Sequence, residues 1–542
     1  MTGSGTRRRL RAPSRRLSAV LAVAAMVVVL AACSDQPAAQ STNKTFTLAV
    51  QSDPQSLDPA TATDLPGSVV MVNLYEPLIK FEGSPPKMVM HLAESMTTND
   101  DGATYTAKLK PNLKFHDGSP LNARAVAYSM DRLLTMKGGR AAPLLSLIGP
   151  GNTTAVDDLT VSFKLKQKSA VFPSALAFFF IVNPVQIDAN KQASGPYGSN
   201  GDYGAQWLSS HDAGSGPYTL TSRTPNSEMR FTAYNDYWGG WKDNQFKAFT
   251  IKVASEAASA GLLLKQGVVD AIYENYPTSV FDDLEKAQNV KVYTDLGLKP
   301  FYLFLNNQVA PTSNLKFRQA LAYAFDYDSA LKLAKGSERL PGPLPTEVFS
   351  AITQPAYTTN MDKARQLLRE SGVNPGSVRL TFGSLGGPSS IQTKVATLFQ
   401  SNVAPLGIKV DISNHAWADI LAQTSKPNTT KNVYAIQLAP AYPDPDGVLP
   451  QAWDTSSHGS WSGAQWYTNA EVDKLLAEGR STLDENRRKT IYTQVQQDII
   501  DDSPAIFMMN IPVQVAISSK VGGYKFDVQY YNYQVYKLFA NR

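Results

Sequence analysis

The sequence predicts a mixed α/β protein, because segments with the period of a strand and segments with the period of a helix occur along the whole chain. Residues 45–50 alternate apolar and polar side chains, which is typical of a half-buried strand. Residues 123–134 carry apolar side chains at helical spacing. The chain has 542 residues, enough for two or three domains with large cores, and it shows no internal repeat.

Further segments extend this pattern toward the C-terminus. Strands are expected at 104–109, 161–165 and 506–517, and helices at 253–266, 315–332, 362–371 and 484–500. Ser313 or Asn314 can cap the helix at 315–332, and Asp362 is expected to cap the helix that ends before Gly372.

The first 33 residues have the pattern of a secretion signal. Six arginines precede an apolar run at 19–32, which is shorter than the roughly 20 residues that a spanning helix needs. The sequence Leu30-Ala31-Ala32-Cys33 resembles the lipobox of bacterial lipoproteins, whose cysteine is lipidated. We therefore expect a signal peptide at 1–32, a lipid anchor on Cys33 and a flexible tether at 33–44.

Alternatives for this segment are an ordinary signal peptide with a chance cysteine, or an uncleaved anchor. Arg15-Arg16 leaves both the general and the twin-arginine export routes open. On either route, the body of the protein is expected at the outer face of the cytoplasmic membrane.

The net charge of the chain depends on this signal. The formal charge is +5, but residues 1–32 hold six of the 51 Lys and Arg and none of the 46 Asp and Glu, so their removal leaves −1. A basic pI is therefore no argument for a nucleic-acid partner, and none is expected. Cys33 is the only cysteine, which excludes an internal disulfide and a cysteine metal site in the body.

Motifs for catalysis or cofactor binding are scarce. The sequence has no P-loop, no G-x-S-x-G and no H-E-x-x-H, and its five histidines are widely spaced. Ser313-Asn314-Leu315-Lys316 matches the S-x-x-K of penicillin-interacting enzymes without its companion motifs. We therefore expect a protein that holds no cofactor or metal and is not an enzyme. The alternative from a different functional class is a hydrolase that uses Ser313 and Lys316.

Several longer motifs, taken in order, resemble the family 5 extracellular solute-binding proteins of bacterial ABC importers, which include oligopeptide, dipeptide and nickel binders. The resemblance covers about residues 45–520. The motifs are Leu57-Asp58-Pro59, Asn73-Leu74-Tyr75-Glu76-Pro77-Leu78, His91-Leu92-Ala93-Glu94-Ser95, Phe115-His116-Asp117-Gly118-Ser119-Pro120, Gly214-Ser215-Gly216-Pro217-Tyr218, Asn235-Asp236-Tyr237-Trp238-Gly239-Gly240 and Arg318-Gln319-Ala320-Leu321-Ala322-Tyr323-Ala324.

This resemblance implies a two-lobed periplasmic-binding-protein-like α/β fold that opens and closes about a hinge. Lobe 1 would comprise 45–298, with 82–210 as an extra subdomain, and the chain would return to it at 509–542. Lobe 2 would comprise 299–508. The resemblance further implies a monomer that captures oligopeptides or peptide-like compounds between the lobes and delivers them to ABC permease subunits in the membrane.

The resemblance also implies a ligand site in the segment 437–446. In peptide-binding members an aspartate before a tyrosine holds the free amino group of the peptide, and Ala441 stands at that place here, before Tyr442. Three readings follow. Asp444 or Asp446 replaces the aspartate, Glu76 binds the amino group, or the ligand has no free amino terminus.

Aromatic residues are dense near this segment. Trp417 matches a family tryptophan that lies against ligand side chains. Two or three of six aromatic residues are expected to line the cleft, and the rest to pack in the protein: Trp417, Tyr442, Trp453, Trp461, Trp466 and Tyr467. Aromatic rings also suit sugars, so oligosaccharides, other amines and metal chelates remain alternative ligands.

Overall fold

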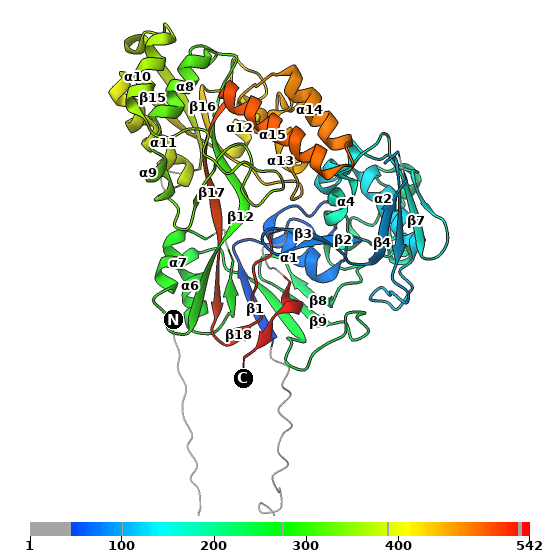
Figure 1. Cartoon of the computed structure of the whole chain (residues 1–542). Coiled ribbons are helices and arrows are strands. Elements are labelled where there is room, and N and C mark those ends of the chain that lie inside the picture. Colours follow the sequence, from blue (N-terminus) through cyan, green and yellow to red (C-terminus); the bar gives the residue numbers. More distant parts are fainter. Residues whose placement is uncertain (1–44, 100, 274–275, 387–389, 529–533, 542) are drawn as a thin grey trace, which may run out of the picture. The chain divides into compact units, whose positions relative to one another are not determined.

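The computed structural model describes residues 45–99, 101–273, 276–386, 390–528 and 534–541 (Figure 1). The expected signal peptide, the lipidation site Cys33 and the tether lie outside the described residues. In the described part of the chain, no helix is both long and apolar enough to cross a bilayer.

Eleven of the described strands form one sheet. They are β1 (Thr45–Val50), β8 (Tyr218–Thr224), β9 (Glu228–Ala233), β10 (Ala248–Val253), β11 (Ala271–Ile272), β12 (Val290–Leu305), β13 (Glu338–Arg339), β14 (Arg379–Leu385), β15 (Lys409–His415), β16 (Val433–Gln437) and β17 (Ala505–Ser518). The order is β15-β14-β16-β12-β17-β11-β1-β10-β9-β8, and β13 pairs with β17 beside this path.

Two long strands, β12 and β17, connect the two halves of this sheet (Figure 1). They pair antiparallel from Val290 opposite Ser518 to Phe304 opposite Ala505, and the register shifts between Leu296 and Pro300. Beyond this shift β12 pairs with β16, whereas the other end of β17 pairs with β11. A bulge bends a strand locally, so the two halves of the sheet meet at an irregular point.

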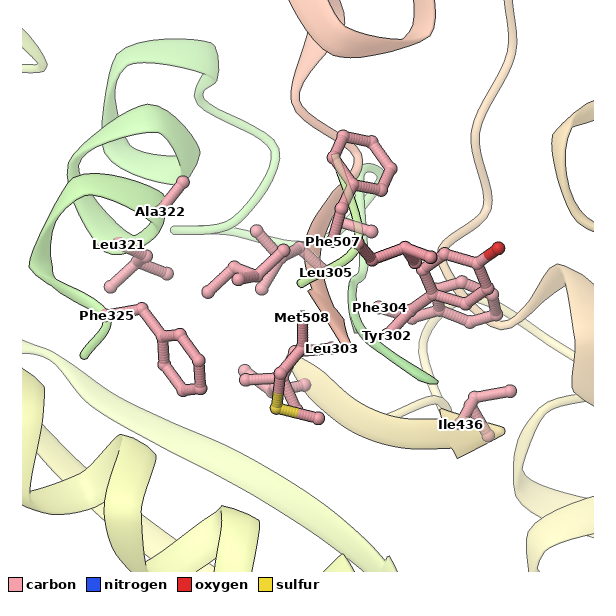
Figure 2. Close-up of a cluster of buried hydrophobic side chains, with 14 of the residues drawn as sticks. Tyr302, Leu303, Phe304, Leu305, Leu321, Ala322, Phe325, Ile436, Phe507 and Met508 are labelled. Carbon is pink, nitrogen blue, oxygen red and sulfur yellow. The ribbon is translucent and has the colours of Figure 1, made fainter. Parts of the chain in front are cut away.

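A large hydrophobic core surrounds the half of the sheet that contains β14, β15 and β16. Tyr302 and Phe304 stack on one face of β12 and contact the buried ring of Trp453. Leu303 and Leu305 alternate with them along the strand and are fully buried. Figure 2 shows the four side chains of β12 near Phe507 and Met508 of β17 and Leu321 and Ala322 of helix α8 (Leu315–Ala324).

Three other hydrophobic cores are present among the described residues. One surrounds β1, β9, β10 and part of β17, and includes Phe46, Phe231 and Phe249. A smaller one includes Leu264, Phe281 and Leu284. The third is formed largely by residues 60–181 around a separate four-stranded sheet. That sheet has the order β4-β5-β7-β6, with β4 (Ala93–Thr98), β5 (Thr104–Leu109), β6 (Thr153–Ala155) and β7 (Thr160–Lys164).

The remaining strands form two small pairs, β2 (Ile79–Glu82) with β3 (Lys87–Met90) and β18 (Val521–Gly522) with β19 (Phe539–Ala540). The other helices are α1 (Leu65–Leu74), α2 (Ala123–Met136), α3 (Ala142–Leu145), α4 (Phe172–Ala175), α5 (Pro184–Asn190), α6 (Ala257–Lys265), α7 (Thr278–Leu284), α9 (Tyr327–Leu331), α10 (Met361–Glu370), α11 (Ile391–Val403), α12 (Trp417–Gln423), α13 (Pro445–Trp453), α14 (Ala470–Ser481) and α15 (Glu485–Asp502).

Most predicted elements are present, but the predicted helix at 315–332 is wrong in its length. It divides into α8 and α9, because Phe325 is extended and Asp326 accepts a hydrogen bond from the backbone of Ser329, which caps the second helix. Asn314 caps α8, as expected.

Two further boundaries differ from the prediction. The expected helix at 253–266 begins only at Ala257, because Val253 is still part of β10 and pairs with Val50 of β1. Asp362 lies inside the first turn of α10, whose cap is Asn360.

Candidate functional site

A cavity of about 680 Å³ is lined by stretches of the chain that are far apart in sequence. Most of its lining side chains are apolar, and its charged ones are Arg140, Asp446 and Arg480. This size and composition are those of a small-molecule or peptide site. The lining residues are Thr63, Leu65, Ser68, Val72, Gly139, Arg140, Ala142, Pro143, Ser146, Phe178, Phe180, Leu298, Ala439, Pro440, Ala441, Tyr442, Pro443, Asp446, Pro450, Gln451, Arg480 and Val528.

The turn after β16 places Ala441 and Tyr442 against this cavity. Asp444 caps α13 by accepting a hydrogen bond from the backbone of Asp446 at 3.0 Å. The backbone N–H of Ala441 donates to the carbonyl of Gly447 at 2.9 Å. A side chain at Gly447 would overlap the carbonyl oxygen of Tyr442, so only glycine permits this close approach.

Asp446 is the centre of a buried polar group in the cavity wall. Its side chain is 3% exposed and accepts hydrogen bonds from the hydroxyl of Tyr442 at 2.6 Å and from Nε of Arg480 at 2.9 Å. Burial raises the pKa of the Asp446 carboxyl, and Arg480 opposes that shift. Both carboxylate oxygens therefore already have partners from the protein.

Asp444 is also paired within the protein. Nη2 of Arg488 lies 2.8 and 3.0 Å from its two carboxylate oxygens. Burial alone would lower the pKa of Arg488, but Asp444 and neighbouring groups raise it. Asp444 is not among the residues that line the cavity.

Glu76 lies in the wall of a second cavity of about 280 Å³. Val72 and Phe180 line both cavities, so the two are neighbours. The carboxylate of Glu76 is buried, and it accepts hydrogen bonds from Tyr237 at 2.8 Å and from the indole of Trp238 at 2.9 Å.

His91 and Ser215 complete the surroundings of Glu76. Nε2 of His91 lies 2.9 Å from Oε1, and the hydroxyl of Ser215 lies 3.5 Å from Oε2. Burial lowers the pKa of His91, although the hydrogen bond to Glu76 raises it. Four protein groups therefore hold this carboxylate, and all come from motifs that carry the resemblance.

Trp417 stands apart from these residues. It begins α12, is 43% exposed and contacts the edge of Trp461, with ring centroids 5.2 Å apart. Neither residue is among those that line the larger cavity, and Trp453 is in the core. Of the aromatic residues near this segment that the sequence singled out, Tyr442 lines the cavity.

Other aromatic and charged lining residues were not predicted. Arg140, Phe178 and Phe180 come from the 60–181 region, and Arg480 comes from the last turn of α14. Arg140 follows two glycines and belongs to no motif, so the only available signal would have been its place in the fold.

Ser313 and Lys316 lie on the exposed start of α8. Lys316 pairs with Glu370 at 3.3 Å, and both Ser313 and Lys316 are outside the lining of the cavities described above. Among the described residues, no group of three or more His, Cys, Asp or Glu could hold a metal ion.

Comparison with known proteins identifies the family. The profile of "Bacterial extracellular solute-binding proteins, family 5 Middle" matches residues 87–460. The probable D,D-dipeptide-binding periplasmic protein DdpA of Escherichia coli (strain K12) is 29% identical over 487 residues, which cover 88% of this chain and 90% of that protein.

Solved structures show the same fold. The ABC transporter substrate-binding protein CtaP of Listeria monocytogenes has a TM-score of 0.81 at 22% identity, covering 92% of this chain and 99% of that one. DppA of Helicobacter pylori, solved in complex with the peptide STSA, has a TM-score of 0.74 at 22% identity, covering 92% and 98%. These matches confirm the predicted two-lobed α/β fold. The chain therefore belongs to family 5 of the bacterial extracellular solute-binding proteins.

Proposed function

We propose that this protein is the extracytoplasmic binding component of an ABC importer that captures peptides or peptide-like compounds. The observation that carries the proposal is the cavity of about 680 Å³, which joins residues of the 60–181 region to residues 439–451. Its mostly apolar wall with a few polar groups suits a peptide-sized ligand. The names of DdpA and of the DppA complex support peptide chemistry within this family.

Capture would proceed by closure of two lobes. We propose lobe 1 at 45–298 with the return at 509–542, lobe 2 at 299–508, and a hinge where β12 and β17 shift register. Contacts across the cavity support a closed arrangement. Tyr442 packs in the core of the 60–181 region, and the backbone N–H of Ala170 donates to the carbonyl of Arg480 at 2.7 Å.

The proposal includes delivery and anchoring. The closed protein would release its ligand to ABC permease subunits, and a lipid on Cys33 would hold it at the outer face of the cytoplasmic membrane. The lipobox-like sequence supports this anchor.

Identification of a bound ligand tests the proposal directly. The purified protein is incubated with a mixture of peptides, separated from unbound peptide, denatured and analysed by mass spectrometry. We expect intact peptides to be retained. Retention of no peptide, or of cleaved products, would contradict the proposal. Loss of peptide uptake in cells that lack this protein, restored by the wild-type chain, tests the transport step.

A further inference from the structure

Arg480 has hydrogen-bond donors that the protein itself does not use. The residue lines the larger cavity, its side chain is 25% exposed, and its Nε donates to Oδ1 of Asp446 at 2.9 Å. Among the described residues, neither Nη1 nor Nη2 of Arg480 has a hydrogen-bond partner, and neither atom is fully buried. A guanidinium held through Nε keeps its two terminal nitrogens as a pair of donors. Arg480 can therefore bind a further acceptor without losing Asp446.

The neighbours of Arg480 fix the position of this guanidinium. Asp446 is 3% exposed, and its other oxygen, Oδ2, accepts a hydrogen bond from the hydroxyl of Tyr442 at 2.6 Å. Arg480 lies in the last turn of α14, and its backbone carbonyl accepts a hydrogen bond from the N–H of Ala170 at 2.7 Å. These contacts orient the side chain before a ligand arrives, which reduces the entropy lost on binding.

Arg480 stays charged, although its charge is largely balanced. Burial alone would lower the pKa of Arg480, but Asp446 and Tyr442 raise it, and the pKa is raised overall. The carboxylate of Asp446 balances the positive charge from 2.9 Å away. A charged donor still forms a stronger hydrogen bond than a neutral one, and more so in a mostly apolar wall. Nη1 and Nη2 therefore offer strong, directional hydrogen bonds to a ligand without adding a large net charge to the cavity.

We infer that Arg480 determines ligand specificity by donating from Nη1 and Nη2 to an oxygen-bearing group of the ligand. This inference rests on the proposed function and deepens it, because it names one side chain and the chemistry that this side chain recognises. A peptide offers two such groups, the terminal carboxylate, which can accept both hydrogen bonds, and a carbonyl of the peptide chain. A ligand without an acceptor at this place would cover the two donors and leave them unpaired, which is costly.

The test changes one acceptor at a time in a peptide that the protein retains. An equimolar mixture of tripeptides built from alanine, valine, leucine and phenylalanine is offered to the protein, and the retained peptides are identified by mass spectrometry. One retained tripeptide is then compared by calorimetry with its C-terminal amide and with the two analogues in which sulfur replaces the oxygen of one peptide carbonyl. We expect one of these changes to weaken binding at least about fivefold, because it weakens or removes a hydrogen bond to a charged group.

The double variant Asp446→Asn with Arg480→Met assigns this effect to Arg480. It removes the donors and leaves no stranded charge, so the sensitive change in the peptide should now alter the affinity less than about twofold. Asp446→Asn alone keeps both donors, and its sensitivity should equal or exceed that of the wild type. The control Arg487→Met should behave as the wild type, because Arg487 is 60% exposed, pairs with Glu478 at 2.7 Å and lies outside the cavity lining.

Circular dichroism and urea unfolding establish that each variant is folded. Arg480→Lys replaces the double variant should that one not fold, because lysine keeps a cation beside Asp446 but lacks the terminal pair of nitrogens. We expect the same loss of sensitivity in Arg480→Lys as in the double variant.

The outcomes separate this inference from the proposed function. Equal binding of the tripeptide and all its analogues by the wild type would overturn the inference, and peptide capture would stand. A variant that lacks Arg480 but keeps the sensitivity of the wild type would do the same. A variant that binds every form more weakly, with the ratios unchanged, would give Arg480 a purely structural role and would also overturn the inference. Should the wild type retain no tripeptide, the proposed function would fail, and the inference would fail with it.

Discussion

Replacement of Arg132 by methionine should destabilise the protein strongly, because Arg132 and Asp58 form a buried ion pair. Nη1 and Nη2 of Arg132 lie 2.8 and 2.5 Å from the two carboxylate oxygens of Asp58, and both side chains are no more than 3% exposed. Nε of Arg132 also donates to the carbonyl of Tyr203 at 2.9 Å. Methionine keeps much of the packing volume but removes every one of these hydrogen bonds.

The expected cost follows from what remains after the substitution. Asp58 keeps only local partners, including the backbone N–H of Ala60 at 2.9 Å, and its charge stays buried. Removing one partner of a buried ion pair typically costs about 3–5 kcal/mol. The variant Arg124→Met serves as control on the same helix, because Arg124 and Asp158 lie 2.7 Å apart with both side chains 71% exposed. An exposed pair of this kind contributes about 1 kcal/mol or less.

Urea unfolding followed by circular dichroism measures both free energies of unfolding. We expect Arg132→Met to lose at least about 2 kcal/mol more than Arg124→Met. Equal losses in the two variants would refute the reasoning, since burial would then not determine the value of the pair. The double variant Asp58→Asn with Arg132→Met should recover part of the loss, because it removes the stranded charge.

The same pair supports the wall of the larger cavity, the proposed ligand site. Asp58 holds Ala60, and Gly138 packs against Ala60 so closely that a Cβ at Gly138 would overlap the carbonyl of Ala60. Arg140, two residues further, then reaches the carbonyl of Ala62. We therefore expect Arg132→Met to weaken ligand binding as well as stability, whereas Arg124→Met should leave binding unchanged.

Three further predictions concern the site and the anchor. Gly447→Ala should weaken ligand binding and cost about 1–3 kcal/mol of stability, because the new Cβ would push the carbonyl of Tyr442 away. Calorimetry measures the loss of binding, and urea unfolding measures the loss of stability. His91→Gln should flatten the fall in stability below the ordinary pKa of 6.5, because the folded chain disfavours protonation of the histidine and the unfolded chain does not. Cys33→Ser should move the protein from the membrane fraction to the soluble fraction of cells, as shown by immunoblotting.

A specific result would contradict each of these three predictions. A Gly447→Ala variant with wild-type affinity would show that the turn tolerates a side chain. The pKa of His91 is lowered in the folded state, so His91 makes the folded protein less stable as the pH falls. A greater loss of stability at low pH in His91→Gln than in the wild type would contradict this prediction. Retention of Cys33→Ser in washed membranes would contradict the lipid anchor.

Local sequence signals predicted much of the secondary structure, but they failed where tertiary contacts determine the end of a helix. Asn314 caps α8 as expected, because capping depends on residues within one turn. The division of the helix predicted at 315–332 depends on Asp326, which caps α9. The backbone N–H of Asp326 donates to Oδ1 of Asn402 in the distant helix α11 at 2.8 Å. Apolar periodicity continues through this break and gives no sign of it.

The candidate site was predictable only where a motif marked it. The resemblance led to the turn containing Ala441 and Tyr442, and both line the cavity. Arg140 could not be found in this way. Only the fold brings it to the same cavity as Tyr442 and Asp446, which lie some 300 residues later in the chain. The sequence also could not show that Asp446 is paired, because its partner Arg480 lies 34 residues away on another helix.

The pairing of the acids changes how the substitution at Ala441 is understood. If Asp446 had replaced the missing aspartate, its carboxylate would face the cavity without a cation from the protein. Instead Arg480 and Tyr442 donate hydrogen bonds to its two oxygens. The charge of Asp446 is therefore largely balanced by Arg480 before a ligand arrives. A ligand ammonium would gain less from this paired carboxylate than from an unpaired aspartate, so Asp446 does not simply replace the acid that is missing at Ala441.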